Sequence, residues 1–289
     1  MNRPHPEYLV ESDWLAAHLD DPSLRVLECT TILHPLPEGG FRAESGLATW
    51  AAGHIPRSGF ADLTGELSDR ASSLRFMMPP PDQLASAMAK LGVGDGTRVV
   101  LYDRAVNMWA ARVWWMLRAI GFDAATLLNG GWRKWTLEGR PVSTQPSPYP
   151  PGRLIARPRP NLFADKTAVL AGLGDTATCV LNALTEEQHR GTGGVHYGRP
   201  GRIAGSGNVP ARSLVDAKTH AYLPLDQLRQ LFEQAGVLAS GRVITYCGGG
   251  IAASSDAFVL AMLGHDDVAV YDASLSEWAA DASLPMQTG

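Results

Sequence analysis

The sequence predicts an α/β protein made of two copies of one domain, each a parallel sheet flanked by helices on both faces. Three observations indicate this fold. Short apolar runs alternate with segments whose apolar residues recur every three or four positions, a pattern typical of buried parallel strands joined by helices. A Pro-rich stretch divides the chain near its middle, and features of the first half recur in the same order in the second.

The individual elements follow from these patterns. Runs rich in Val, Leu and Ile are the predicted strands, at 24–27, 99–102, 126–128, 179–181, 243–246 and 268–271. Apolar residues at helical spacing predict the helices, at 81–90, 109–120, 225–235 and 252–263. The tryptophans of the second helix, Trp109, Trp114 and Trp115, are expected in the core or between domains.

An internal duplication sets the domain boundaries. Tyr102 and Asp103 correspond to Tyr246 and Cys247, and Trp135 corresponds to Trp278, at almost the same offset. Seven prolines lie between Arg140 and Asn161, where fixed φ angles and missing N–H donors favour an extended linker. We therefore expect an N-terminal domain at 1–143, a linker at 144–160 and a C-terminal domain at 161–289.

Composition narrows the class of protein. The chain has 289 residues, 45% of them hydrophobic and 19% charged, with 25 basic and 29 acidic side chains. Such a chain is not of disordered composition, and no run of like charge indicates a nucleic-acid partner. No apolar run reaches the roughly 20 residues that cross a bilayer, and the first residues lack the apolar core of a signal peptide. We expect a soluble, cytoplasmic protein without a membrane partner.

The three cysteines are far apart and odd in number, which argues against a disulfide framework. Cys29 and Cys179 lie at or in predicted strands, where buried thiols usually serve packing. Cys247 differs, because it directly follows a predicted strand and precedes three glycines and a predicted helix. Ligands of parallel α/β sheets lie beyond the carboxyl ends of the strands, so this loop is the candidate active site.

The loop favours a thiolate. Glycines allow successive N–H groups to turn inward as an anion-binding nest, and a helix N-terminus adds unpaired N–H groups and a positive dipole end. Both stabilise the reactive form of a cysteine. We expect Cys247 to be the nucleophile and the backbone of the rest of the loop to bind its substrate: Gly248, Gly249, Gly250, Ile251 and Ala252.

The chain resembles the tandem-domain rhodaneses, a family of thiosulfate and 3-mercaptopyruvate sulfurtransferases. The resemblance covers almost the whole chain and rests on five motifs: Gly53-His-Ile-Pro56, Tyr102-Asp103, Ala110-Ala-Arg-Val-Trp-Trp115, Gly130-Gly-Trp132 and the loop opened by Cys247. It implies two rhodanese-like domains, the first non-catalytic because Asp103 stands at the cysteine position. It also implies ping-pong transfer of sulfur through a Cys247 persulfide to cyanide, a thiol or a thioredoxin-like protein, without a metal or organic cofactor.

The resemblance also suggests how a small anionic donor is bound. Arginines of the segment 189–202 clamp the donor carboxylate in relatives of the mercaptopyruvate type, which points to Arg199 and Arg190 here. Asp62 corresponds to an acidic residue facing the cleft. The neutral loop favours 3-mercaptopyruvate slightly over thiosulfate, yet Gly249 and Ala252 replace two hydroxyl residues of such loops.

The sequence also bears on three other interpretations of the chain. The missing hydroxyls allow a persulfide carrier that delivers sulfur to one partner protein without efficient turnover. A phosphatase of related fold would need an arginine six residues after the cysteine, where this chain has Ala253. His189 and His196 have no nearby Cys or carboxylate at metal-ligand spacing, which argues against a metal site.

Overall fold

The structure is a computed structural model that describes residues 4–36 and 40–289. The described residues form two five-stranded sheets, each with every neighbouring pair of strands parallel. The strands of the first sheet have the order β1-β7-β6-β2-β5. Their bounds are β1 (Leu9–Val10), β7 (Ala125–Leu128), β6 (Arg98–Tyr102), β2 (Leu24–Glu28) and β5 (Gly59–Phe60).

The second sheet repeats this order. Its strands have the order β8-β13-β12-β9-β11. Their bounds are β8 (Phe163–Ala164), β13 (Val268–Tyr271), β12 (Arg242–Tyr246), β9 (Thr178–Asn182) and β11 (Gly207–Asn208). Strand by strand, the C-terminal sheet therefore has the topology of the N-terminal one, and the predicted fold class is confirmed.

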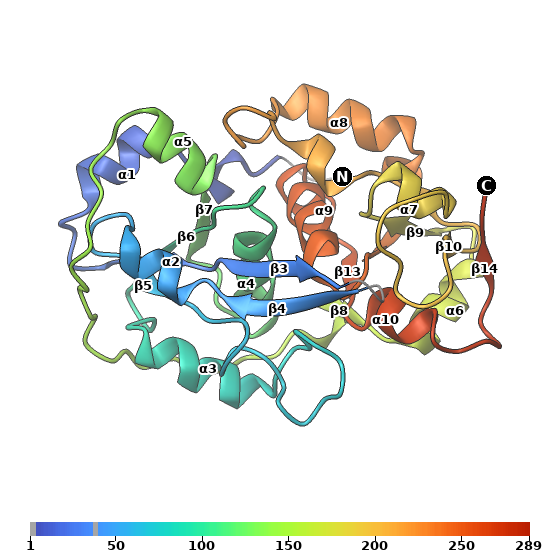
Figure 1. Ribbon diagram of the computed structural model, residues 1–289, viewed down its shortest axis with the longest axis horizontal. Helices are drawn as coiled ribbons and strands as arrows, with labels where there is room; N and C mark the ends of the chain where they lie inside the picture. The colour runs from blue at the N-terminus through green and yellow to red at the C-terminus, as the bar shows by residue number, and fades with distance from the viewer. Residues whose placement is uncertain (1–3, 37–39) are drawn as a thin grey trace.

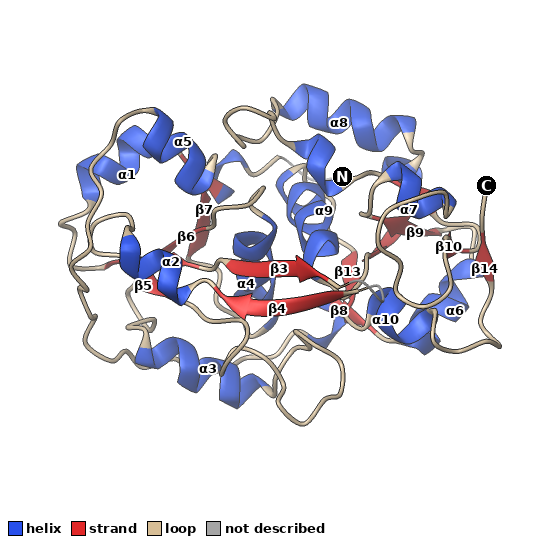
Figure 2. Ribbon diagram, viewed as in Figure 1, coloured by secondary structure: helices blue, strands red, loops and turns tan. Residues whose placement is uncertain are grey.

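Helices cover both sheets (Figures 1 and 2). The N-terminal half contains α1 (Ser12–His18), α2 (Leu47–Ala52), α3 (Pro81–Lys90), α4 (Met108–Ala119) and α5 (Gly131–Leu137). The C-terminal half contains α6 (Lys166–Leu173), α7 (Glu186–Arg190), α8 (Leu225–Gln234), α9 (Ile251–Met262) and α10 (Ser274–Trp278). Proline at the first position of α3 lacks the N–H that would be unpaired there, which fixes the start of that helix.

The two halves meet where α4 packs against α9. These helices follow the central strands β6 and β12, and almost all their residues are buried because each is covered by its own sheet and by the other helix. The ring of Trp114 meets that of Phe258 edge to face at 4.9 Å, and Arg112 pairs with Asp272 across the interface at 2.6 Å. The tryptophans of α4 are buried, as expected.

A β-hairpin that the sequence analysis did not predict projects from the N-terminal half. Strands β3 (Thr31–Pro35) and β4 (Phe41–Ser45) pair antiparallel and extend across the middle of the molecule toward α10 (Figure 1). The residues of β4 alternate between half-buried and exposed positions, but those of β3 do not, so the pair has no common period. A second short pair, β10 (Arg202–Ile203) and β14 (Met286–Gln287), lies near the C-terminus.

The Pro-rich segment contains no helix or named strand between residues 138 and 159. It nevertheless follows the N-terminal half closely, because Gly152 N–H donates to Ala89 O at 2.8 Å and Arg157 N–H to Ile120 O at 2.7 Å. The division into 1–143, 144–160 and 161–289 stays a proposal, and residues 1–3 and 37–39 of it lie outside the described residues.

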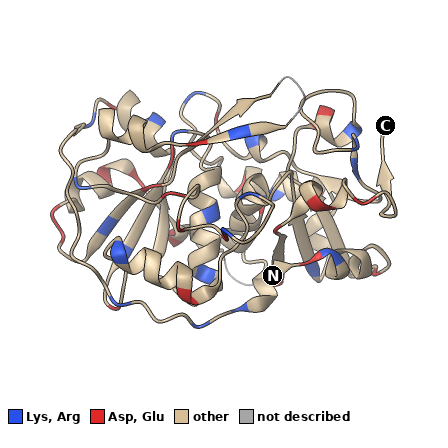
Figure 3. Cartoon of the chain, turned by 60° about the horizontal axis from the view of Figure 1, so that its bottom comes forward, with Lys and Arg blue, Asp and Glu red and all other residues tan. Residues whose placement is uncertain are grey.

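Charged side chains of both signs are interleaved along the chain (Figure 3). Within the described ranges, no helix is both long and apolar enough to cross a membrane.

Candidate active site

Cys247 lies at the carboxyl end of the central strand β12, immediately before α9. Gly250 caps α9 with φ of 74°, in the left-handed region that glycine enters without strain. A Cβ on Gly250 would approach Asp272 O to 2.9 Å and the Arg112 guanidinium to 3.2 Å. Glycine is therefore required at this position, both for its backbone conformation and because a side chain would collide with Asp272 and Arg112.

Serine hydroxyls hold the loop from behind. Ser274 Oγ accepts the N–H of Cys247 and the N–H of Gly250, both at 3.1 Å, and donates to Tyr271 O at 2.7 Å. Ser276 Oγ donates to Gly248 O at 2.7 Å. These contacts hold both ends of the glycine segment.

In the N-terminal copy, the equivalent loop binds the carboxylate of Asp103 through backbone N–H groups. Asp103 follows β6 as Cys247 follows β12, and Asn107 caps α4 with φ of 65° as Gly250 caps α9. The Asp103 carboxylate accepts four backbone N–H groups at 2.8–3.1 Å, from Ala105, Asn107, Trp109 and Ala110. Burial still raises the pKa of Asp103, the opposing effect of those hydrogen bonds being smaller. The loop and first helical turn thus converge on the side chain that follows the strand.

Cys247 opens onto a pocket of about 750 Å³ between the two halves. The loop contributes Cys247, Gly249, Ile251 and Ala252 to its lining. The hairpin β3–β4 and the start of α4 form the opposite wall, largely through apolar side chains: Ile32, Leu33, Pro35, Phe41, Val106, Met108 and Trp109. The thiol is buried, with 3% of Cys247 exposed, but it is not sealed in the core.

Gly248 and Gly250 do not line this pocket. The ring of Tyr197 lies directly on Gly248, where an added Cβ would overlap Cζ and Oη of the tyrosine. Gly250 faces the Arg112–Asp272 pair below the loop. Of the five loop residues expected to bind substrate, the structure brings Gly249, Ile251 and Ala252 to the pocket.

Arg199 is not among the residues that line the Cys247 pocket, and its role in clamping the donor stays a prediction. Its guanidinium donates to four backbone carbonyl oxygens at 2.6–3.1 Å, those of Trp278, Ala279, Asp281 and Leu284. These bonds occupy four of the five N–H donors of the guanidinium. Arg199 thereby attaches its loop to the C-terminal segment.

Arg190 and Asp62 also lie away from the pocket lining. Arg190 pairs with Glu186 one turn earlier on α7, and both side chains are more than half exposed. Asp62 accepts Ser45 Oγ at 2.9 Å and the N–H and hydroxyl of Thr64 at 2.7–2.8 Å. Local partners hold both side chains in these positions, and their role in donor binding stays a prediction.

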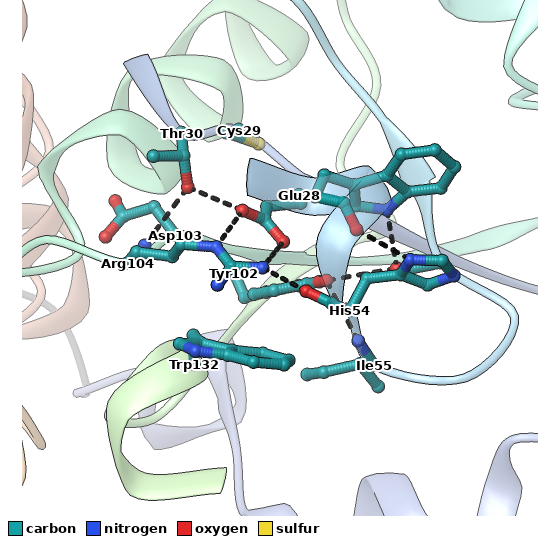
Figure 4. Close-up of polar contacts among 12 residues, drawn as sticks. Glu28, Cys29, Thr30, His54, Ile55, Tyr102, Asp103, Arg104 and Trp132 are labelled. Atoms are coloured by element: carbon teal, nitrogen blue, oxygen red, sulfur yellow. Dashed lines mark hydrogen bonds and ion pairs between the residues drawn. The ribbon is translucent and has the colours of Figure 1, made fainter. Parts of the chain in front are cut away.

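Three other arginines line the pocket: Arg75, Arg104 and Arg212. Arg104 is neutralised, because Nε and Nη2 contact the two oxygens of the fully buried Glu28 at 2.6 and 3.2 Å. Figure 4 shows its guanidinium between Glu28 and the ring of Trp132, whose centroid is 4.1 Å away. Arg75 donates to Phe41 O.

Arg212 is the pocket cation with the most available charge. It is exposed, lies on the short helix η3 (Ala211–Leu214), and forms no ion pair with any residue that the structure describes. Neither Arg212 nor Tyr197 was predicted from the sequence. Both are distant from Cys247 along the chain, and only the fold brings them to its pocket.

The other two cysteines are poorer nucleophiles. Burial, aided by the charges of Asp103 and Glu28, raises the pKa of Cys29 well above its ordinary value. Burial also raises the pKa of Cys179. Across the described part of the chain, no group of three or more His, Cys, Asp or Glu side chains is placed to hold a metal ion.

Comparison with known proteins matches this geometry to one family. The model of the rhodanese-like domain matches residues 11–138 and 181–281. A 3-mercaptopyruvate sulfurtransferase of Escherichia coli strain K12 is 31% identical over 97% of this chain and 98% of its own length. The sulfur carrier protein TtuD of Thermus thermophilus is 30% identical over 100% of this chain and 99% of that protein.

A solved structure has the same architecture. The crystal structure of SseA from Escherichia coli, described as showing the rhodanese fold and catalytic mechanism of 3-mercaptopyruvate sulfotransferases, superposes with a TM-score of 0.81. It is 29% identical, and the match covers 93% of this chain and 99% of SseA.

Proposed function

Because the chain belongs to the rhodanese family and is a sulfurtransferase, we propose that Cys247 carries the sulfur between a small anionic donor and a thiophilic acceptor. The observation that supports this most strongly is the pair of equivalent loops. Four N–H groups hold a carboxylate at Asp103, and the shorter, glycine-rich loop places Cys247 at the corresponding point beside a pocket.

The first step forms the persulfide. With thiosulfate, the Cys247 thiolate attacks the outer sulfur, a new S–S bond forms, and sulfite leaves with the electron pair of the old one. With 3-mercaptopyruvate, the thiolate attacks the thiol sulfur and the C–S bond breaks. Its electron pair passes to carbon as an enolate, which takes up the thiol proton and becomes pyruvate. Either route leaves a negatively charged terminal sulfur on Cys247.

The loop is suited to that charge. The first-turn N–H groups of α9 have no carbonyl partner within the helix, and the helix dipole adds positive potential at the same point. The persulfide sulfur would take the position that the Asp103 oxygens occupy in the other copy, and the same N–H groups would stabilise charge developing in the transition state.

The second step returns Cys247 to the thiolate. A nucleophile such as cyanide, a thiol or the cysteine of a thioredoxin-like protein attacks the terminal sulfur, and the S–S electron pair stays on Cys247. The pocket of about 750 Å³ accommodates acceptors considerably larger than cyanide.

Donor binding is assigned to Arg212, with Arg75 as a second cation at the pocket edge. An anion needs a cation whose hydrogen-bond donors are free, and Arg104 is occupied by Glu28. Both candidate donors are anions, so Arg212 serves either. The neutral loop favours 3-mercaptopyruvate.

A steady-state assay with each donor and cyanide tests the proposal. We expect turnover in the native protein, no turnover in Cys247→Ser, and unchanged turnover in the matched variant Cys179→Ser. Turnover in Cys247→Ser would contradict the assignment of the nucleophile.

A persulfide carrier is the alternative. It is favoured by the similarity to TtuD, which is named a sulfur carrier protein, and by the absence of a hydroxyl at Gly249 and Ala252. Under this alternative, Cys247 accepts sulfur stoichiometrically, but the rate with both small donors and cyanide is negligible. The same assay, combined with a measurement of bound sulfur, separates the two functions.

A further inference from the structure

We propose that the Tyr197 hydroxyl donates a hydrogen bond to the sulfur that Cys247 carries, in place of the missing loop hydroxyl. This assignment rests on the proposed function. Tyr197 lies outside the loop in sequence, fifty residues before Cys247, and is brought to it by the fold.

The fold places Tyr197 against the residue that follows the nucleophile. Its ring lies on Gly248, the residue that follows the nucleophile, close enough that a Cβ there would overlap Oη. Tyr197 and Cys247 line the same pocket. Among the described residues, Tyr197 Oη has no hydrogen-bond partner in the protein, so its donor is available to a bound group.

The serine hydroxyls that contact the loop backbone are already engaged. Ser274 Oγ donates to Tyr271 O, Ser254 Oγ to Gly250 O, and Ser276 Oγ to Gly248 O, each at 2.7 Å. A hydroxyl has one proton to donate. None of the three can therefore donate to the sulfur without losing a contact that maintains the loop.

The phenol is also in the protonation state that donation requires. Burial and, to a lesser extent, the charge of Cys247 raise the pKa of Tyr197, against a smaller opposing effect of Arg75. The hydroxyl therefore keeps its proton at neutral pH. Because the group acts by hydrogen bonding alone, no proton is transferred, and the atoms and electrons of both chemical steps are unchanged.

The loop around Tyr197 is held firmly. Two residues later, Arg199 donates to four carbonyl oxygens of the C-terminal segment. Two residues earlier, Val195 O accepts Gln188 Nε2 at 2.7 Å. The ring of Phe41 on the hairpin lies 6.5 Å from that of Tyr197. Arg199 is thus a positioning residue that acts through Tyr197.

Tyr197→Phe is the direct test, with Tyr149→Phe as the matched control far from the pocket. Thiosulfate is the donor and cyanide the acceptor, and each variant is first checked for native circular dichroism and thermal midpoint. We expect Tyr197→Phe to acquire one sulfur atom on Cys247, with kcat lower by about ten- to a hundredfold, the range for a lost hydrogen bond to a charged group.

The pH profile distinguishes a hydrogen bond from a structural effect. A donor to the anion lowers the pKa of the persulfide, so the reaction of the loaded protein with an alkylating agent should shift to higher pH in Tyr197→Phe and stay unchanged in Tyr149→Phe. Arg199→Ala should shift the profile in the same direction.

The outcomes separate the two proposals. If the native protein loads no sulfur, the proposed function fails. If it loads sulfur and Tyr197→Phe has the native kcat and pH profile, the role of Tyr197 is refuted and the proposed function stands. A folded Tyr197→Phe that loads no sulfur also refutes this role, because one hydrogen bond does not account for complete loss.

Discussion

The ion pair between Arg112 and Asp272 connects the domain interface to the active-site loop. Arg112 of α4 is fully buried and Asp272 is 9% exposed on its side chain, with 2.6 Å between Nη2 and Oδ1. The Arg112 guanidinium and Asp272 also lie directly beneath Gly250. We expect Asp272→Asn to lower both the stability of the protein and its rate of sulfur transfer.

The contacts of Asp272 determine how much stability each substitution should remove. In Asp272→Asn, the Arg112 guanidinium keeps its bond to Phe76 O at 2.7 Å but loses its countercharge, and an uncompensated buried charge costs about 3–5 kcal/mol. The amide oxygen can still accept Met78 N–H, as Oδ2 does at 2.7 Å. Asp272→Ala leaves that N–H unpaired as well, which adds about 1–3 kcal/mol.

Urea unfolding at pH 7, followed by tryptophan fluorescence and circular dichroism, measures the loss. Coincidence of the two signals checks that unfolding is two-state. Glu66→Gln is the control, because it breaks an ion pair with Lys90 whose side chains are more than half exposed, and such pairs contribute less than about 1 kcal/mol. The double variant Arg112→Met, Asp272→Asn should lose less free energy of unfolding than the two single variants lose in sum.

Two results would refute this reasoning. A loss below about 1 kcal/mol in Asp272→Asn would mean that the charge is not effectively buried. Strict additivity in the double variant would mean that the two side chains do not interact.

Three further expectations concern other parts of the molecule. Burial raises the pKa of Asp256 well above its ordinary value, so the folded state retains a proton that the unfolded chain releases. The free energy of unfolding should then fall as pH rises above about 4, by up to about 1.4 kcal/mol per unit, and Asp256→Asn should lack this slope in urea titrations across pH. Arg212→Ala should raise KM for thiosulfate roughly tenfold with kcat little changed, whereas Arg190→Ala should leave both constants unaltered. Ser274→Ala removes the acceptor of two loop N–H groups. It should lower the free energy of unfolding by about 1–3 kcal/mol per buried N–H left unpaired, measured by urea unfolding, and should lower kcat in the same steady-state assay.

Much of the fold could be predicted because its signals are local. The central strands and the helices α3, α4, α8 and α9 agree with the predicted segments to within one or two residues, since long apolar periods define them. The edge strands have only two residues each in β1, β5, β8 and β11. Such short segments carry no periodicity, and only pairing with a neighbour defines them.

The loop at Cys247 was predictable for the same reason. Its nucleophile, glycines and helix start are consecutive in the sequence, so their relation to β12 does not depend on distant contacts. The alignment of Asp103 with Cys247 followed from the repeat, and both residues follow the central strands of equivalent sheets.

The side chains that surround the loop could not be predicted in this way. Arg199 and Tyr197 lie two residues apart in one Gly-rich segment, yet the first is bound to backbone carbonyls and the second lies on Gly248. Their directions are determined by the C-terminal residues 278–284 and by the hairpin β3–β4, which are distant in sequence. The sequence could therefore locate this segment, but not which of its side chains lies on Gly248.

The central claim is that Cys247 alone bears the transferred sulfur. The most direct test is mass spectrometry of the three cysteine peptides. The native protein is incubated with thiosulfate, its thiols are blocked, and it is digested without reductant. The peptide with Cys247 should gain one sulfur atom, and those with Cys29 and Cys179 should gain none. Sulfur on either of the latter, or a native protein that gains none, would contradict the account.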